Sequence, residues 1–145
     1  MAEIIYQLKQ YTDAPHQSNI VWLAENDIDK LNEHLILAEQ KPSKDDDWFK
    51  EMYQAGVARY CLLYHDGLPV ARGAVEPLSE QVWEAADIRT AKAYRSKGFA
   101  KEILRFLSQY IIEHGKIASC RTEEDNEAMH NVIKSIGYKE AETWT

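Results

Sequence analysis

The sequence contains no apolar run that approaches the roughly 20 residues needed to span a bilayer. Its first residues also lack a basic segment followed by an apolar stretch, the pattern of a secretion signal. We therefore predict a soluble, cytoplasmic protein that does not enter a membrane. Its length of 145 residues, of which 45% are hydrophobic, allows one sizeable core, so we expect a single domain over residues 1–145.

The residue patterns of common metal and redox sites are also missing. The two cysteines, Cys61 and Cys120, form no C-x-x-C motif, and each lies in an apolar, strand-like run. The five histidines include no H-x-x-x-H pair. We expect two buried thiols and no metal.

Glycine-rich phosphate loops of the two commonest kinds are absent. The six glycines include no G-x-G pair, and none is followed by Lys-Ser or Lys-Thr. A Rossmann dinucleotide loop and a Walker phosphate loop are therefore excluded.

Positive charge is scarce overall but concentrated in one place. The net charge of −7 argues against nucleic acid as a partner. Residues 89–105 nevertheless contain six basic side chains and one acid, a local charge of +5, which leaves −12 for the rest of the chain. One small region is suited to bind an anion.

The hydrophobic periodicity predicts an α+β fold: a mixed, mostly antiparallel sheet flanked by helices. Predicted strands cover residues 4–8, 59–64, 68–75, 82–90, 116–122 and 138–144. Predicted helices run from Asp27 to Ala38, from the acids at 45–47 to Gly56, from Phe99 to Gly115, and from Asp125, as N-cap, to Gly137. Asp66-Gly67 predicts a hairpin turn. The conformation of the apolar stretch before Asp27 stays open.

The segment Arg95-Ser96-Lys97-Gly98-Phe99-Ala100 lies between the predicted strand 82–90 and the long helix that follows. A helix start exposes about four unpaired N–H groups and a partial positive charge. Because Gly98 has no Cβ, a diphosphate could approach the backbone closely there. This junction predicts a pyrophosphate site.

This segment resembles the acetyl-CoA loop of the GNAT (Gcn5-related) N-acetyltransferases, which reads Q/R-x-x-G-x-G/A between a strand and a helix. Residues 125–138 resemble the family's second signature, in which an Asn opens a helix that ends in Gly and an aromatic residue. The clear resemblance covers about residues 82–138. The N-terminal third agrees only in the order of its elements.

The resemblance implies a set of residues that bind acetyl-CoA. Backbone amides of residues 95–101 would hold the pyrophosphate, and backbone groups of residues 89–91 would pair with the pantetheine arm. The implied cofactor-binding residues are Arg89, Thr90, Ala91, Arg95, Ser96, Lys97, Gly98, Phe99, Ala100, Lys101 and Asn126. In this family the strand before the loop usually carries a bulge that opens the cofactor slot, and the sequence shows no sign of one.

Two carboxylates on that strand, Glu84 and Asp87, are candidate catalytic bases. A lysine-like amine has a pKa of about 10.4, so deprotonating it at pH 7 costs roughly 4.6 kcal/mol. In a regular strand these two side chains point to opposite faces, so we expect at most one to line the slot. The tyrosine that protonates the leaving thiolate in many family members corresponds to Ile133, and Tyr94, His130 and Tyr138 are alternative groups.

The resemblance implies an N-acetyltransferase that moves an acetyl group from acetyl-CoA to a primary amine, on a small molecule or a peptide, by direct transfer in a ternary complex. Acids at residues 76, 80, 84 and 123–125 favour a cationic acceptor or form a solvated surface. An acyl-CoA-binding sensor or assembly module without turnover is an alternative, which the missing tyrosine favours. A third hypothesis is a regulatory domain that holds a nucleotide or RNA. A homodimer stays open.

Overall fold

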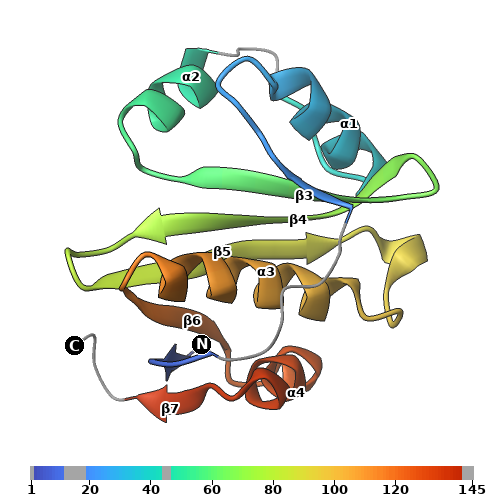
Figure 1. The fold of residues 1–145 in the computed structure, drawn as a ribbon. Helices are drawn as coiled ribbons and strands as arrows, with labels where there is room; N and C mark the ends of the chain where they lie inside the picture. Colours follow the sequence, from blue (N-terminus) through green and yellow to red (C-terminus); the bar gives the residue numbers. More distant parts are fainter. Residues whose placement is uncertain (1, 12–18, 44–46, 142–145) are drawn as a thin grey trace.

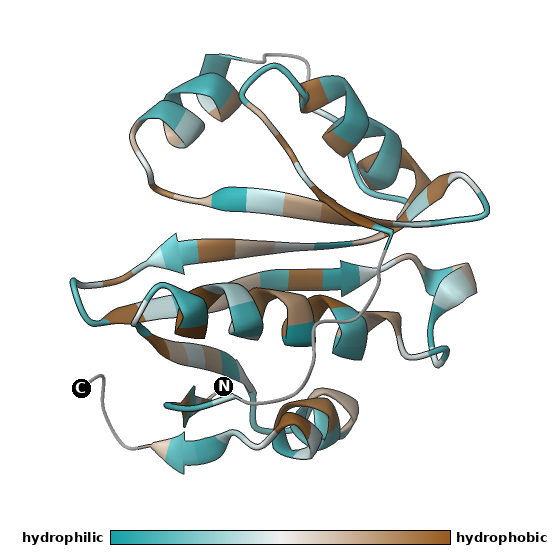
Figure 2. Ribbon diagram, viewed as in Figure 1, coloured by the Kyte–Doolittle hydropathy of each residue, from teal (hydrophilic) through white to brown (hydrophobic). Residues whose placement is uncertain are grey.

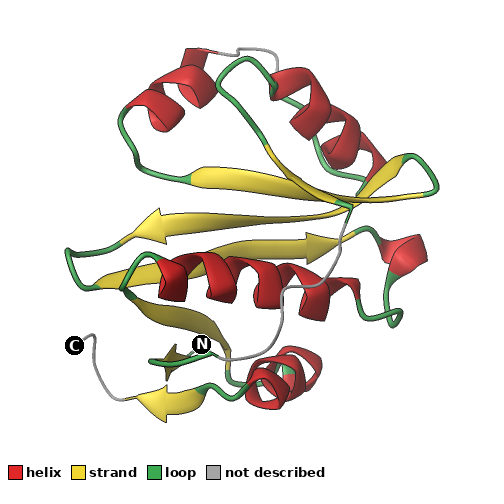
Figure 3. Ribbon diagram, in the orientation of Figure 1, coloured by secondary structure: helices red, strands yellow, loops and turns green. Residues whose placement is uncertain are grey.

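Seven strands form one continuous sheet, on which four α-helices pack (Figures 1 and 3). The computed structural model describes residues 2–11, 19–43 and 47–141. The strands are β1 (Glu3–Leu8), β2 (Ile20–Trp22), β3 (Arg59–His65), β4 (Leu68–Pro77), β5 (Val82–Thr90), β6 (Ile117–Glu123) and β7 (Lys139–Ala141). The helices are α1 (Ile28–Leu37), α2 (Asp47–Gln54), α3 (Phe99–Glu113) and α4 (Glu127–Ile136), with a short 3-10 helix η1 (Lys92–Tyr94) before α3.

The strand order is β2-β3-β4-β5-β6-β1-β7. Every neighbouring pair is antiparallel except β5 and β6, which run parallel. The predicted α+β class with a mixed, mostly antiparallel sheet is therefore confirmed. Among the described residues, no helix is both long and apolar enough to cross a membrane.

The hairpin of β3 and β4 forms where the turn residues predict it. Asp66 and Gly67 both have positive φ values, 52° and 80°. Two consecutive residues in this conformation match the right-handed twist of the strands that they connect. The local signal is sufficient here because a two-residue turn brings the strands together without any distant contact.

The structure corrects one sequence-based expectation and assigns a stretch that was left open, while some predicted residues lie outside those described. The stretch left open before Asp27 contains β2, a three-residue edge strand on β3. The N-cap of α4 is Asn126 rather than Asp125, because the Asn126 side chain accepts a hydrogen bond from the Met129 N–H. Residues 45, 46 and 142–144, which were assigned to a helix start and to the last strand, lie outside the described residues.

The two faces of the sheet carry different helices. A Cβ added to Gly73 in β4 would lie 2.5 Å from Ile103 and 2.9 Å from Leu107 of α3. The neighbouring Arg72 instead contacts His34 of α1. Because adjacent strand residues point to opposite faces, α3 covers one face and α1 the other. We call the second one the α1 face.

The larger core cluster lies on the α3 side. The amphipathic pattern of α3, visible as alternating brown and teal in Figure 2, buries Ile103, Leu104, Leu107 and Ile111 completely. A smaller cluster under α1 and α2 joins Phe49 to Leu62. Cys61 and Cys120 are free and buried, as predicted, and burial raises the pKa of each thiol to about 12.

Candidate functional site

The parallel pair β5 and β6 separates part of the way along its length. Only Val82, Trp83 and Glu84 pair with β6, opposite Ile117, Ala118 and Ser119. Beyond this point an open cavity of about 320 Å³ lies between the strands. It is lined by residues 84–89 of β5 and 120–122 of β6, together with Glu3, Asn126 and Met129. We call this cavity the β5–β6 cleft.

A bulge in β5 accompanies the separation. On β4, Arg72 pairs with Arg89 and Ala74 pairs with Ala86, so one β4 residue opposes two residues of β5. Asp87 is one of those two, and its φ is 51°. The resemblance implied such a bulge, but nothing in residues 82–90 identifies it, because it depends on the register against β4.

The bulge changes which face Asp87 occupies. Glu84 lies opposite Glu76 of β4, and Asp87 binds Arg72 of β4. Glu76 and Arg72 are four residues apart in one strand and therefore share a face. Glu84 and Asp87 thus both lie on the α1 face and both line the cleft, so the expectation that only one of them does is wrong.

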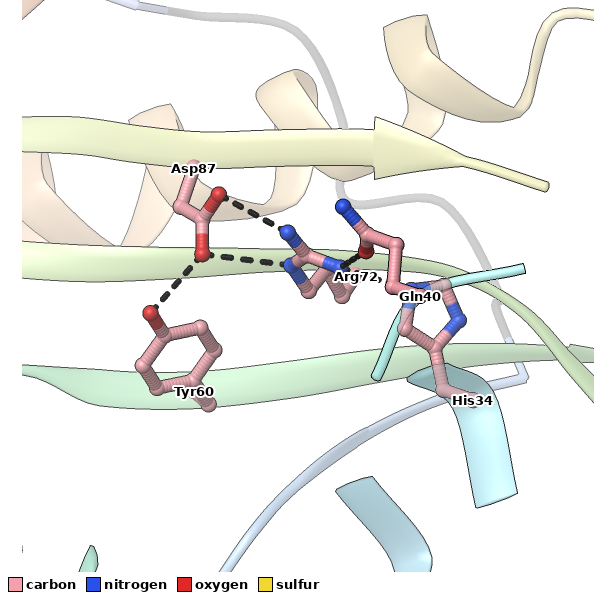
Figure 4. A network of polar contacts seen from close by, with 5 residues as sticks. All are labelled: His34, Gln40, Tyr60, Arg72 and Asp87. Carbon is pink, nitrogen blue, oxygen red and sulfur yellow. Dashed lines mark hydrogen bonds and ion pairs between the residues drawn. The ribbon is translucent and has the colours of Figure 1, made fainter. Parts of the chain in front are cut away.

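Asp87 is held by a network of polar side chains (Figure 4). Arg72 donates two hydrogen bonds to its carboxylate, at 3.0 and 3.1 Å, and the Tyr60 hydroxyl donates a third at 2.8 Å. The other side of the Arg72 guanidinium donates to Gln40 at 2.6 Å and contacts His34 Nε2 at 3.3 Å. Burial, and then Asp87, raises the pKa of Tyr60. The network ties the bulge to α1.

His34 is neutral in this network. It is fully buried, and burial lowers its pKa. Its Nδ1 lies 2.8 Å from the Pro69 carbonyl oxygen, so Nδ1 carries the hydrogen and Nε2 accepts from Arg72. A neutral imidazole can therefore support the Arg72 guanidinium without repelling it.

Glu84 is also paired. Arg121 of β6 donates to its two carboxylate oxygens, at 2.9 and 3.4 Å, and the Glu84 side chain is only 6% exposed. The hydrogen bonds to Glu84 raise the pKa of Arg121. Both predicted bases thus have an arginine partner that occupies their carboxylate oxygens.

Glu76 is a carboxylate that the catalytic assignment from sequence missed. It lies across from Glu84 on the α1 face and forms no hydrogen bond or ion pair with any described residue. Burial, followed by the charges of Glu84 and Asp87, raises its pKa. The residues next to Glu76 in the sequence do not indicate that its pKa is raised. Pairing β4 with β5 around the turn at 78–81 would, however, have placed Glu76 near Glu84.

The loop before α3 has the predicted form of a helix start. Ser96 and Gly98 have φ values of 65° and 87°, and α3 begins at Phe99. The first intrahelical bond runs from the Glu102 N–H to the Gly98 carbonyl, so the amides of residues 99–101 precede the ladder. A Cβ on Gly98 would meet nothing within 4 Å. Its left-handed φ, rather than crowding, is what favours glycine there.

The residues predicted to contact the pantetheine arm differ in whether their hydrogen-bonding groups are already occupied. Ala91 donates its N–H to Val70 and accepts from the Tyr94 N–H, so its backbone is engaged. The antiparallel ladder alternates, so Thr90 turns its backbone away from β4, and its carbonyl accepts from Arg95 Nε at 3.1 Å. Thr90 Oγ1 is buried and has no partner among the described residues. Arg89 and Asn126 line the cleft.

The three groups suggested as general acids each contact other residues, and Tyr94 lies against the His65 ring, with centroids 6.3 Å apart. Ile133 is completely buried in the core. Tyr138 is buried and lies 2.6 Å from the Ser108 hydroxyl, and the His130 Nδ1 lies 2.7 Å from the Tyr6 hydroxyl. Within the described part of the chain, no group of three or more His, Cys, Asp or Glu side chains could hold a metal ion.

The match of an acetyltransferase family model, on a chain that has these separated strands, the bulge and the helix start, identifies the protein as an acyltransferase. More particularly, the model of the acetyltransferase (GNAT) family matches residues 28–138, and the chain belongs to that family. Acetyl transfer is the chemistry of that family, whose members differ in the acceptor. No curated protein is similar enough in sequence to count as a match.

Several solved structures share the fold at low identity. The ribosomal-protein-alanine N-acetyltransferase of Brucella melitensis biovar Abortus 2308 is 20% identical, with a TM-score of 0.64 over 87% of this chain and 94% of that one. AAC(6')-Iy, in complex with the bisubstrate analogue CoA-S-monomethyl-acetylneamine, is 16% identical, with a TM-score of 0.66 over 90% and 96%. A GNAT-family protein of Novosphingobium aromaticivorans is 18% identical, with a TM-score of 0.69 over 97% of this chain, which spans 60% of its length.

Proposed function

We propose that the β5–β6 cleft binds acetyl-CoA and that this chain transfers the acetyl group to a primary amine. The separation of β5 from β6 beside the start of α3 carries the proposal, because it creates an open slot next to unpaired helix amides. The amides at the start of α3, with the side chains of Lys97 and Lys101, would hold the pyrophosphate. Bound acetyl-CoA supplies an activated thioester.

The end of β5 provides partners for the pantetheine arm. Thr90 offers its backbone N–H, which the ladder turns away from β4, and its buried Oγ1 lacks a partner in the described residues; its carbonyl already accepts from Arg95. Asn126 lines the same cleft from the start of α4. Because the Ala91 backbone is already hydrogen-bonded, the proposed contacts concentrate on Thr90 and Asn126.

The acceptor would be a cationic amine that approaches over the α1 face. Glu76, Glu84 and Asp87 form a group of three carboxylates there, of which two are neutralised by arginines. The third, Glu76, can attract an ammonium group and accept its proton. Its raised pKa makes Glu76 a stronger base than an ordinary glutamate, because this pKa lies closer to the pKa of the ammonium group that it must deprotonate. The freed amine lone pair then attacks the thioester carbonyl directly.

No protein acid is needed to complete the reaction. A thiol has a pKa of about 8.5, so a thiolate leaves with less help than an alkoxide would need. Ile133 therefore does not prevent turnover, and water can protonate the thiolate. The sulfur–acyl bond breaks as the nitrogen–acyl bond forms, the nitrogen gives a proton to water in exchange for the one that the thiolate gains, and the products are the N-acetyl amine and free coenzyme A.

Acetyl-CoA binding and thiol release test the two halves of this proposal separately. A hundredfold excess of acetyl-CoA over its Kd should stabilise the protein by about 2.7 kcal/mol, a rise in Tm of roughly 8 °C. Thiol release should then appear with one or more members of a panel of polyamines, aminoglycosides, amino acids and peptide N-termini. Binding without thiol release would favour the sensor, and no stabilisation would reject the cofactor assignment.

A further inference from the structure

A second cavity of about 400 Å³ lies at the opposite end of α3 from Gly98. Its wall includes Tyr53 of α2, Arg59 of β3, Val75 and Pro77 of β4, Trp83 of β5 and Tyr110 of α3. Trp83 pairs with Pro77, on the face that α3 covers, whereas Glu84 lies on the α1 face. This cavity is thus separate from the β5–β6 cleft. Its volume is in the range of small-molecule sites.

The cavity combines aromatic walls with one guanidinium. Arg59 lies over the Trp22 ring, with its Cζ 4.3 Å from the ring centroid, and its Nη1 donates to the Tyr110 hydroxyl at 3.2 Å. The ring of Trp22 lies 4.7 Å from that of Tyr110, and Trp83 stacks on Tyr110 at 6.2 Å. These contacts hold the guanidinium and the rings in fixed positions.

Arg59 differs from Arg72 and Arg121, two other arginines of the sheet, because it has no counter-charge. Arg72 binds Asp87 and Arg121 binds Glu84, each within about 3 Å. Arg59 forms no ion pair with any described residue, and its Nε is buried without a hydrogen-bond partner. A half-buried charge without a partner is unfavourable, since buried charges are normally paired. An anion in the cavity would relieve this cost.

A second cation, Lys116, and the imidazole ring of His114 lie against the same aromatic rings. The Lys116 Nζ lies 5.6 Å from the centroid of the Trp83 ring. The His114 ring lies 5.4 Å from that of Trp83 and 4.2 Å from that of Tyr110. In a protein with a net charge of −7, this is a local concentration of positive charge on aromatic surface. Such a combination suits a ligand that is both flat and anionic.

We propose that this cavity binds a small aromatic carboxylic acid, with the ring against Trp83 and Tyr110 and the carboxylate against Arg59. The site is independent of acetyl transfer, because it shares no lining residue with the β5–β6 cleft. An uncharged amide of the same shape binds much more weakly, since it leaves the Arg59 charge unmatched.

Benzoate and indole-3-acetate are suitable probes, with benzamide as the uncharged match. In spectra that resolve the tryptophan indole N–H signals, either acid should shift the Trp83 and Trp22 signals saturably below about 10 mM, the weak range for small ligands. The indole N–H signal of Trp48, a residue of α2, should not shift. Benzamide should bind at least tenfold more weakly. Equal binding of benzoate and benzamide, or no saturable shift, would overturn the proposal.

Substitution of Arg59 tests whether the carboxylate of the ligand binds there. Arg59→Gln should weaken benzoate binding at least tenfold, whereas Lys134→Gln, which removes an equal charge from the exposed surface of α4, should leave it unchanged. If Arg59→Gln does not fold, the comparison of benzoate with benzamide on the unaltered protein still shows whether binding requires a carboxylate. Saturating acetyl-CoA should not displace benzoate. Displacement would mean that the acid occupies the β5–β6 cleft and would reject the second site.

Discussion

Three carboxylates and two arginines meet on the α1 face, and their pairing separates the roles of the acids. Arg121 holds Glu84, and Arg72 holds Asp87 in the left-handed conformation of the bulge. Glu76 lies opposite Glu84 without a hydrogen bond to an arginine, and burial, followed by the charges of Glu84 and Asp87, raises its pKa. A carboxylate in this situation is costly to ionise, which is a reason to look for function there.

Glu76→Gln should lower kcat/KM for the amine acceptor by roughly 10²- to 10⁴-fold, the usual contribution of a general base. The acetyl-CoA affinity should stay unchanged, as measured by calorimetry. Glu51→Gln on the exposed surface of α2 is the matched control. In the unaltered enzyme, activity should rise with pH through a pKa above that of an ordinary glutamate, and this limb should vanish in Glu76→Gln. Full activity of the variant would assign the base elsewhere.

The same substitution should make the folded protein more stable at neutral pH. A raised folded-state pKa favours the protonated carboxyl, so the contribution of Glu76 to stability is present below its unfolded pKa and is lost as pH rises through its folded pKa. Urea unfolding should therefore find Glu76→Gln more stable than the unaltered protein at pH 7. The difference should disappear near pH 3, below the ordinary glutamate range. A variant that is less stable at pH 7 would contradict this assignment.

Arg72 should act by positioning Asp87 rather than by touching a substrate. Arg72→Gln leaves Asp87 without its cation, and since Asp87 is 35% exposed we expect a loss of roughly 2–3 kcal/mol, below the range for fully buried pairs. Combining it with Asp87→Asn should recover part of that loss, because neither partner is then an unpaired charge. Additive losses in urea unfolding would show that the pair does not hold the bulge.

Among the secondary-structure elements, the start of α3 combines a left-handed backbone conformation at Gly98 with the proposed binding of the pyrophosphate. Substitutions can separate these two contributions. Gly98 has a left-handed φ with open space around it, so Gly98→Ala should cost about 1–2 kcal/mol of stability through the backbone alone. Gly98→Glu adds a negative charge beside the unpaired amides. It should weaken acetyl-CoA binding at least tenfold more than Gly98→Ala does, as measured by calorimetry.

The other end of the same helix provides the control. Gly115 also has a positive φ, 73°, and nothing within 4 Å of an added Cβ. Gly115→Ala and Gly115→Glu should therefore carry the same backbone cost without changing acetyl-CoA affinity. If Gly98→Glu binds acetyl-CoA as well as Gly98→Ala does, the loop does not hold the pyrophosphate.

At the scale of the whole molecule, charge is divided between the two sides of the proposed reaction. The start of α3 belongs to the +5 region, whereas the rest of the chain carries −12. The field of the acidic part should attract a cationic amine over distances that salt shortens. Raising ionic strength from about 0.05 M to about 0.5 M should increase KM for a cationic acceptor several-fold with little change in kcat. A salt-independent KM would argue against electrostatic attraction of the acceptor.

Features that depend on near neighbours in the chain were predictable from the sequence. The hairpin at Asp66-Gly67, the apolar stripe of α3 and the Gly98 junction follow from turn residues and periodicity within a few positions. The family resemblance rests on the same local segments, and the match over residues 28–138 agrees with it.

The combination of distant residues, in contrast, depends on strand register and long-range packing. β1, near the start of the chain, lies between β6 and β7, and no local pattern specifies that place. The bulge at Asp87 appears only when β5 is aligned with β4, and it brings Asp87 to the face of Glu84. The partners Arg72 and Arg121 are 15 and 37 residues from Asp87 and Glu84. Periodicity reports which face a residue prefers, whereas register and long-range packing decide which charges meet.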